Sequence, residues 1–405
     1  MGDRMAAGSL RDATPRTGRG ERPIRWGLSP SSRGVGGLLF AVLSVAVLLV
    51  AAACVPSPQA ARPDARRDKA AAANDARYLV GGPYAVGVTT LDLGDRKVDV
   101  WYPAERVSGP TAVDQAEMLF APAIRALLPQ GLSLTIDLYG HRDAPPAAGK
   151  HPLVLFAHGI FSWRGQSAPL TAHLASWGLV VASPDLPEYG LSSLGFPGVS
   201  FFGDAEAGMD RVVERVRAEA GGAGVLGGHI DLDQIAITGH SLGGALSTLY
   251  ASRPFIRAYV PLASAFVLPR AGTGATKPAM WIRATTDATH VDVGLPLARE
   301  AATGSEAVVE IVGGGHVGPF APALCEAGGV GVIPLLARHG FFLPEQLSVV
   351  ADDGCRDPNR AGQAKVVAHF LTAQLRWQLG LDPEPVGLGT GVVEHLPVAA
   401  RYEHD

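Results

Sequence analysis

Ser241 stands at the centre of Gly239-His-Ser-Leu-Gly243, a G-x-S-x-G pattern typical of nucleophilic serines. A β-branched apolar run, residues 235–238, precedes the pattern, and an Ala- and Leu-rich run follows it. The spacing therefore predicts a strand, a sharp turn and a helix, with the serine at the apex. The backbone of such an apex is strained, and we expect Gly239 and Gly243 to remove collisions that a Cβ would cause. The hydroxyl would then lie beside a helix N-terminus, which favours developing negative charge.

The pentapeptide is weak evidence alone, because the chain has 50 glycines in 405 residues. A nucleophilic serine also needs an acid, a base and an oxyanion hole. The acid is expected just past a strand that follows the elbow, and Asp287 lies three residues beyond the apolar run ending at Ala284. The alternative for Asp287 is a helix cap. The rival acid is Asp185, which follows a strand before the elbow.

The base is expected in a loop after the last strand of the sheet. His316 follows three glycines in residues 312–320, which is unlike a core histidine on an apolar face. The alternative for His316 is a solvated loop residue. The rival base, His290, is expected to lie at the start of a helix. The chain order Ser241, Asp287, His316 is the one typical of the α/β-hydrolase arrangement.

An oxyanion hole needs two preorganised N–H donors. One is predicted at Leu242, directly after the nucleophile. The other is predicted at Ile160, in the turn His158-Gly159 that follows an apolar strand, with Phe161 as the second candidate. His158 itself is interpreted as structural.

The elements that must position these residues alternate between strand and helix. Short, wholly apolar runs are typical of buried parallel strands, and two of them flank a helical segment to make a βαβ unit. The earlier residues 83–91 and 97–103 alternate apolar and polar positions, which predicts antiparallel edge strands of a hairpin. The fold class is therefore α/β, with a mostly parallel, doubly wound sheet and an N-terminal antiparallel hairpin. The expected strands are 152–157, 178–184, 235–238, 257–263, 279–284 and 307–312, and the expected helices are 165–176, 202–220 and 361–379.

The chain resembles α/β-hydrolase serine esterases, nearest the platelet-activating-factor acetylhydrolase-like and dienelactone-hydrolase-like branch. The resemblance covers about residues 80 to 380. It departs after His316, where the acetylhydrolase branch usually has an aromatic residue and serine but this chain has Val317-Gly-Pro. Dienelactone hydrolases use a cysteine nucleophile, so the serine here favours esters. Cutinase-like polyester hydrolases share the elbow and the oxyanion loop. The matching residues are Pro83-Tyr-Ala-Val-Gly-Val, Val100-Trp-Tyr-Pro103, His158-Gly159, Gly239-His-Ser-Leu-Gly243, Asp287 and Gly315-His316.

The first 54 residues have the pattern of an export signal or membrane anchor. Residues 1–33 carry seven arginines and three acids, and residues 34–53 are apolar and uncharged. Ala51-Ala-Ala-Cys54 resembles a bacterial lipoprotein cleavage box, which implies lipidation of Cys54. An uncleaved membrane helix and a cleaved, secreted form are the alternatives. In each case the arginines stay inside and the following domain lies outside the cytoplasm.

Residues 55–77 are rich in Pro, Ala, Arg and Asp, and are expected to be a flexible tether. The hydrolase domain is expected over 78–382 and a loosely held tail over 383–405. Within the domain, residues 112–128 have helical spacing, and residues 320–360 are a candidate lid. Cys325 and Cys355 lie there; with Cys54 assigned to lipid, a disulfide between them is the natural pairing in an exported domain. Two independent thiols are the alternative.

Composition and charge limit the classes of partner that the chain is expected to bind. Hydrophobic residues make up 47% of the chain and charged residues 18%, with a net charge of −4, which favours a well-buried core. No basic stripe indicates nucleic-acid binding, and no cysteine or histidine spacing indicates a metal. We expect no cofactor, a monomer, and a small-molecule or lipid ester as substrate.

The predicted function is a carboxylic ester hydrolase outside the cytoplasm that works through an acyl-enzyme. A catalytically silent surface lipoprotein with the same fold is the alternative from another class. An acyltransferase would use the same residues and differ in how it excludes water.

Overall fold

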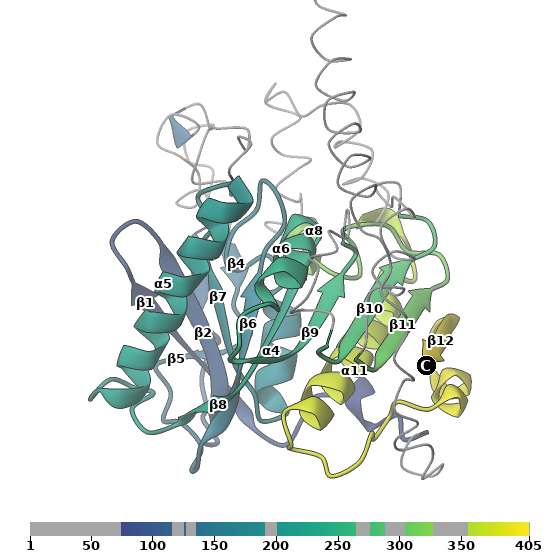
Figure 1. Ribbon diagram of the computed structural model, residues 1–405, viewed down its shortest axis with the longest axis horizontal. Helices are drawn as coiled ribbons and strands as arrows, with labels where there is room; N and C mark the ends of the chain where they lie inside the picture. Colours follow the sequence, from purple (N-terminus) through teal and green to yellow (C-terminus); the bar gives the residue numbers. More distant parts are fainter. Residues whose placement is uncertain are drawn as a thin grey trace, which may run out of the picture. The chain divides into compact units, whose positions relative to one another are not determined.

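The computed structural model describes residues 74–115, 125–126, 135–190, 201–264, 276–287, 304–326 and 355–404. All of these belong to one compact unit, residues 58–405. Its main element is a ten-stranded sheet with helices packed on it (Figure 1). The apolar segment 34–53, Cys54 and the tether up to residue 73 lie outside the described residues. Among the helices that are described, none is long and apolar enough to cross a membrane.

Six neighbouring strands of the sheet run parallel, in the spatial order β11-β10-β9-β8-β6-β7. Most are short and apolar and are buried along nearly their whole length, as their sequences predict for strands covered on both faces. They are β6 (His151–Ala157), β7 (Val180–Pro184), β8 (Ile230–His240), β9 (Ile256–Leu262), β10 (Ala279–Ala284) and β11 (Glu306–Ile311).

The N-terminal hairpin consists of β1 (Ala85–Asp92) and β2 (Lys97–Ala104), which pair antiparallel as predicted. However, β2 is not an edge strand, because it also pairs antiparallel with β7. Its side chains are buried from Val98 onward, and β5 (His141–Arg142) continues the sheet beyond β1. The hairpin therefore extends the parallel sheet and is part of the core.

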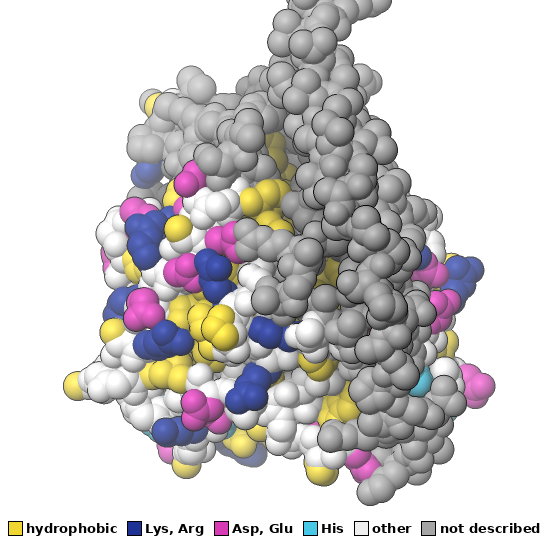
Figure 2. Space-filling model, in the orientation of Figure 1, with side chains coloured by type: hydrophobic (Ala, Val, Ile, Leu, Met, Phe, Trp, Pro, Cys, Tyr) yellow, Lys and Arg dark blue, Asp and Glu magenta, His cyan; other side chains and the backbone are white. Residues whose placement is uncertain are grey.

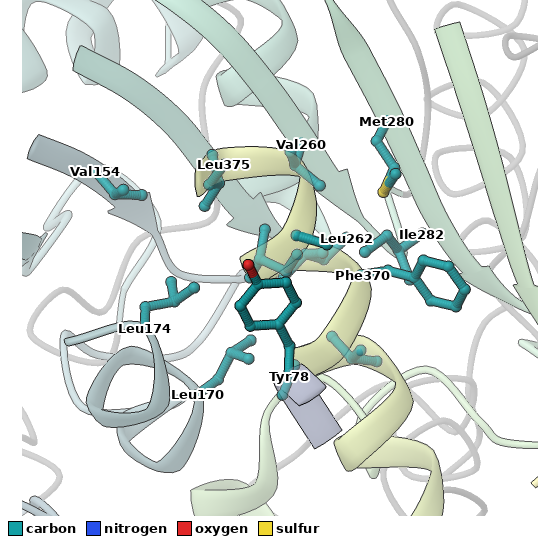
Figure 3. Packing of buried hydrophobic residues seen from close by; sticks show 14 of the residues in the cluster. Tyr78, Val154, Leu170, Leu174, Val260, Leu262, Met280, Ile282, Phe370 and Leu375 are labelled. Carbon is teal, nitrogen blue, oxygen red and sulfur yellow. The ribbon is translucent and has the colours of Figure 1, made fainter. Parts of the chain in front are cut away.

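Helices cover both faces of the sheet, so the predicted doubly wound fold class is confirmed. On one face, α4 (Ala168–Ser176) and α11 (Arg360–Gln378) contribute to a hydrophobic cluster with the strands (Figure 3). Tyr78, from the short helix η2 (Arg77–Leu79), lies within this cluster. On the other face, α5 (Phe201–Gly221) and α6 (Leu242–Tyr250) pack in a second cluster.

The outer surface around α5 carries charges of both signs close together. Figure 2 shows basic, acidic and apolar side chains interspersed on this face. Arg211 pairs with Asp95 at 2.9 Å, and Arg217 pairs with Glu214 at 2.8 Å. Such exposed pairs contribute little to stability, so the helix is held mainly by its apolar face.

The expectation of a loosely held tail is wrong. Residues Ala400–His404 form β12, which pairs antiparallel with β11 and completes that edge of the sheet. Ala400 is buried, and the Tyr402 ring stacks on Phe370 with 5.3 Å between the ring centroids. A strand covers β11 here because an uncovered edge strand would leave unpaired N–H and C=O groups. The 3₁₀ helix η5 (Thr390–His395) precedes β12.

Two further predictions concern residues 112–128, whose spacing is helical, and the candidate lid. Within 112–128, Val113–Gln115 is strand β3, paired with β4 (Thr135–Asp137), and not helix. Most of the rest of that segment, and the centre of the candidate lid, lie outside the described residues. Short helix α8 (Pro322–Glu326) is described, and Cys325 forms the predicted disulfide with Cys355, thirty residues further on.

Candidate active site

The sheet changes direction between two central strands. From β6 the chain proceeds to β7 on one side, and from neighbouring β8 it proceeds to β9 on the other side. In open α/β sheets the crevice outside the carboxyl ends at such a switch point is where ligands bind. His158-Gly159 follows β6 and His240-Ser241 ends and follows β8. A Cβ built on Gly159 would lie 3.4 Å from the Cβ of Ser241, so the two turns are in contact.

Ser241 occupies the strained apex that the sequence predicts. Its φ of 57° and ψ of −116° are unusual for a residue with a side chain, and it is the N-cap of α6. A Cβ on Gly239 would approach the Gly243 carbonyl oxygen to 2.3 Å, and one on Gly243 would approach the Ala157 oxygen to 2.1 Å. Only glycine fits at these two positions. The serine is 6% exposed, so its hydroxyl lies in a largely enclosed place.

Asp287 and His316 are hydrogen bonded, with 2.8 Å between Oδ2 and Nδ1. Both residues are buried. An ionised carboxylate only accepts, so Nδ1 carries the proton and Nε2 is left as the acceptor. This is the tautomer that a general base facing a serine requires.

The loops that carry this pair are fastened to each other by two further hydrogen bonds. The Thr286 hydroxyl donates to the Gly314 carbonyl at 2.6 Å, and the Gly313 N–H donates to the Thr285 hydroxyl at 3.0 Å. Gly313 and Gly314 have φ values of 72° and 75°, which glycine adopts without strain. The glycine run before His316 therefore lets the His316 loop turn back against the Asp287 loop.

Among the described residues, the backbone N–H groups of Ile160 and Leu242 have no hydrogen-bond acceptor. These are the two predicted oxyanion donors. The second candidate, Phe161, is occupied, because its N–H donates to the Tyr189 carbonyl at 2.8 Å. Phe161 also has a φ of 52°, which marks the strained turn after Ile160.

His158 is structural, as interpreted from the sequence, and orients the Ile160 N–H. The Leu186 N–H donates to His158 Nε2 at 2.9 Å, so Nδ1 carries the proton and donates to the Gly159 carbonyl at 2.7 Å. A trans peptide places its C=O and N–H on opposite sides. Holding the Gly159 carbonyl on the His158 side thus aims the Ile160 N–H the other way. Burial lowers the pKa of His158, so the ring stays neutral.

The rival acid, Asp185, is bound by an arginine, whereas His316 is bound by Asp287. Asp185 binds Arg164, with 3.0 Å between Oδ2 and Nη1, in a cluster that includes Asp99 and Asp114. The rival base, His290, lies outside the described residues.

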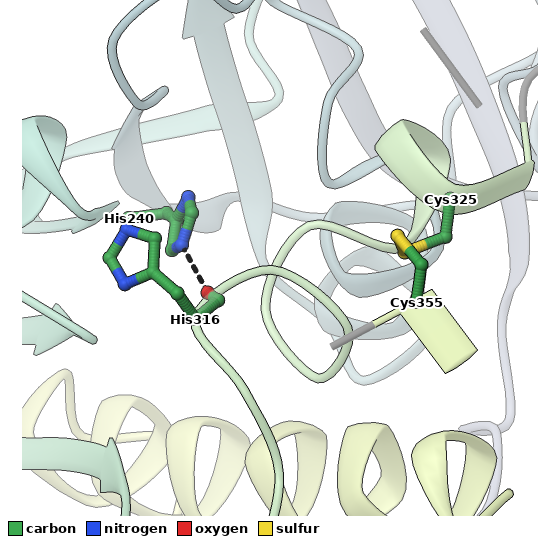
Figure 4. The surroundings of a disulfide bond; sticks show 4 residues. All are labelled: His240, His316, Cys325 and Cys355. Carbon is green, nitrogen blue, oxygen red and sulfur yellow. Dashed lines mark hydrogen bonds between the residues drawn. A yellow bond between two sulfur atoms is a disulfide. The ribbon is translucent and has the colours of Figure 1, made fainter. Parts of the chain in front are cut away.

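Two buried polar residues next to the site, Gln166 and His240, were not singled out from the sequence. The rings of His240 and His316 lie side by side, 4.8 Å apart, and His240 Nε2 donates to the His316 carbonyl (Figure 4). A signal existed for each. His240 is the variable residue inside the elbow pattern, and Gln166 is a polar residue at the start of an apolar helical run.

Comparison with protein families finds no matching family model, and comparison with curated proteins finds no match. Among solved structures, the chain is similar to a ferulic acid esterase from Streptomyces cinnamoneus, with a TM-score of 0.50 and 22% identity. The match covers 75% of this chain and 92% of that chain. At this identity the likeness shows the fold, which is the α/β-hydrolase fold.

Proposed function

We propose that the protein is a serine hydrolase that cleaves carboxylic esters outside the cytoplasm. The observation that carries the proposal is the buried Asp287–His316 hydrogen bond, formed beside the ring of His240, the residue that directly precedes Ser241. A strained nucleophile turn, an oriented imidazole and two N–H groups free to bind an oxyanion are the parts that acyl transfer needs.

In the acylation half-reaction, His316 Nε2 takes the proton of the Ser241 hydroxyl as Oγ bonds to the ester carbonyl carbon. The carbonyl oxygen becomes an oxyanion, held by the N–H groups of Ile160 and Leu242. Asp287 accepts the Nδ1–H throughout and stabilises the imidazolium. The bond from the carbonyl carbon to the alcohol oxygen then breaks, and the leaving alcohol takes the proton from His316.

In the deacylation half-reaction, water replaces the alcohol. His316 removes a proton from the water as its oxygen bonds to the acyl carbon, and the same donors hold the second oxyanion. When the bond from the acyl carbon to Ser241 Oγ breaks, Oγ recovers the proton from His316 and the carboxylic acid leaves. Each oxyanion donor is expected to lower the barrier by about 3 kcal/mol.

Several features support a location outside the cytoplasm. A basic and then apolar leader precedes Cys54, and Cys325 and Cys355 form a disulfide, which persists in oxidising compartments. We propose that lipidated Cys54 anchors the domain to the outer face of the membrane. If it does, mass spectrometry will find a lipid on Cys54 at the N-terminus of the mature protein, whereas Cys54→Ser will lose the lipid and retain the uncleaved segment 34–53.

The substrate class follows from chemistry shared with similar proteins. Within the serine esterases, we place the chain nearest the acetylhydrolase-like and dienelactone-hydrolase-like branch, with small-molecule or lipid esters as substrates. The similar ferulic acid esterase makes feruloyl esters a natural member of the test panel.

The test is hydrolysis of p-nitrophenyl esters of increasing acyl length, together with methyl ferulate. Ser241→Ala is expected to lower kcat/KM by about 10⁴-fold or more, because removing a nucleophile removes the covalent route. Ser247→Ala is the matched control: this serine is buried in the same helix, and its hydroxyl donates to the Gly244 carbonyl. Full activity of Ser241→Ala, or an inactive wild type, would contradict the proposal. Product appearing on an added alcohol in preference to water would favour the acyltransferase.

A further inference from the structure

Three hydrogen bonds connect the oxyanion turn, residues 158–161, to the main chain of His316. Together they form a hydrogen-bond chain through the side chains of Gln166 and His240. The Gly159 N–H donates to Gln166 Oε1 at 2.9 Å. Gln166 Nε2 lies 3.0 Å from His240 Nδ1, and His240 Nε2 lies 2.8 Å from the carbonyl oxygen of His316. Gln166 and His240 are both buried, at 0% and 2% exposure, so solvent does not replace these bonds.

The two ends of this hydrogen-bond chain, the Gly159 N–H and the His316 carbonyl, determine which atom donates and which accepts in each bond between them. The Gly159 N–H can only donate, so the amide of Gln166 must turn Oε1 toward it and Nε2 toward His240. His240 Nδ1 must then accept, which leaves the proton on Nε2. That proton faces the His316 carbonyl, which can only accept. The chain therefore has one consistent arrangement, and it is uncharged.

The electrostatics agree with a neutral ring. Burial, and next the neighbouring His316, lower the pKa of His240 to about 3. His240 thus remains an uncharged hydrogen-bonding group at neutral pH. It adds no positive charge beside His316.

Gln166 and its neighbour Ser167 also bind the segment that follows His316, residues 320–323. The main-chain carbonyl of Gln166 accepts from the Ala323 N–H at 3.2 Å, and the Ser167 hydroxyl donates to the Phe320 carbonyl at 2.8 Å. The Phe320 ring lies nearly parallel to His240, at 14° and 6.0 Å between centroids. Gln166 therefore contacts the turn after β6, the last residue of β8 and helix α8 at once.

We infer that Gln166 and His240 are positioning residues, which hold the oxyanion turn and the base loop in register with Ser241. This inference rests on the proposed function. Gly159 directly precedes the donor Ile160, and the His316 carbonyl belongs to the base itself, so the chain acts on both partners of the nucleophile. Catalytic groups must be held within about 0.5 Å of their working geometry, and a misplacement of 1 Å can cost about 100-fold in rate.

The kinetic test compares Gln166→Met, His240→Phe and the double variant. Methionine keeps the length of glutamine, and phenylalanine keeps the ring that lies against Phe320, but neither makes the hydrogen bonds. Each single variant is expected to lower kcat by about 10- to 100-fold, with KM changed less than about threefold. Because both residues act through one chain, the double variant is expected to lose about as much as the worse single variant.

Thr171→Val is the matched control. Thr171 is buried in α4, the helix that begins two residues after Gln166, and its hydroxyl donates to the Ala168 carbonyl. It is expected to keep wild-type kcat. Losses that multiply in the double variant, or variants that only melt earlier with kcat unchanged, would overturn the inference.

A second measurement does not need activity. In a spectrum of ¹⁵N-histidine protein, the proton on His316 Nδ1 that binds Asp287 reports the position of the base. Gln166→Met is expected to shift this signal and speed its exchange with water, whereas Thr171→Val leaves it unchanged. If the wild type hydrolyses no ester, the proposed function fails while this spectrum still tests the chain. An unchanged signal, or failure of both Gln166→Met and His240→Phe to fold when Thr171→Val folds, would overturn the positioning role.

Discussion

Two polar networks, one uncharged and one charged, hold the segment 158–166 in place. On one side, Gln166 makes the uncharged chain that reaches His316. On the other side, Arg164 binds three carboxylates, with its Nε 2.8 Å from Asp99 and its two terminal nitrogens 2.7 and 3.0 Å from Asp114 and Asp185. The two anchoring residues are separated by one residue in the chain.

The difference lies in what each network fastens. Arg164 ties the segment to strands β2, β3 and the loop after β7, where three carboxyl groups share one guanidinium. The Gln166 chain ties the segment to the proposed catalytic groups, and it does so without introducing a charge there. A buried ion pair gives firm attachment at a desolvation cost, whereas a neutral chain fixes geometry and leaves the local field to Asp287 and the developing oxyanion.

The largest expected effect comes from the acid on the uncharged side. Asp287→Asn is expected to lower kcat by about 10³- to 10⁴-fold, because an amide stabilises the wrong tautomer of His316. Its shape is nearly that of aspartate, so the unfolding midpoint in urea should change little. Steady-state kinetics with a p-nitrophenyl ester measures the first, and urea titration the second. Retention of a tenth or more of wild-type kcat would remove Asp287 from the triad.

The charged side should respond in stability. Arg164→Met leaves Asp99, Asp114 and Asp185 without their shared cation, which is expected to lower the free energy of unfolding by about 3–5 kcal/mol. Arg211→Gln, at an exposed pair with Asp95, is the control and should change it by less than about 0.5 kcal/mol. Equal effects of the two substitutions in urea titrations would show that the buried cluster carries no special weight.

The smallest expected effect is a difference in pH dependence. The native pKa of His240 is lowered to about 3, so below pH 6.5 the unfolded chain binds a proton that the native state refuses. Stability is therefore lost as the pH falls. From pH 7.5 to pH 5 this amounts to about 2 kcal/mol, and His240→Phe removes it. Parallel stability profiles of wild type and His240→Phe, from urea titrations at both pH values, would contradict this.

On the charged side the sign is reversed. Burial raises the pKa of Asp99 to about 6, so its native carboxyl holds a proton that the unfolded chain releases above pH 3.8. The stability that this proton contributes is present at low pH and is lost as the pH rises through about 6. Relative to Asp99→Asn, the wild type should therefore gain about 1 kcal/mol between pH 7.5 and pH 5.

Much of the fold was predictable because its central strands are buried on both faces. Val180–Pro184 and Ala279–Ala284 can be predicted as strands because short apolar runs are typical of strands buried on both faces. The roles of Gly239 and Gly243 were also predictable, since the steric demand of the elbow is local. Asp287 and His316 were predicted from their order after Ser241 in the sequence, and the structure brings these two residues together.

What escaped prediction depends on partners distant in the sequence. Ala400–His404 alternates weakly, and it forms a strand because the edge of β11 is there to pair with. Likewise β2 is interior only because β7 lies beside it. Gln166 acts through its contacts with Gly159 and His240. No local sequence pattern predicts the hydrogen bond between Gln166 and His240, which lie 74 positions apart.

Ser241 is expected to be an activated nucleophile. Reaction of the folded protein with a fluorophosphonate, followed by peptide mass spectrometry, tests it directly, because the reagent phosphonylates only a serine that a neighbouring base has activated. One adduct on Ser241 is predicted, absent in Ser241→Ala and formed far more slowly in His316→Ala. A folded protein that gains no adduct, or one labelled at the wild-type rate after Ser241→Ala, would contradict this role of Ser241.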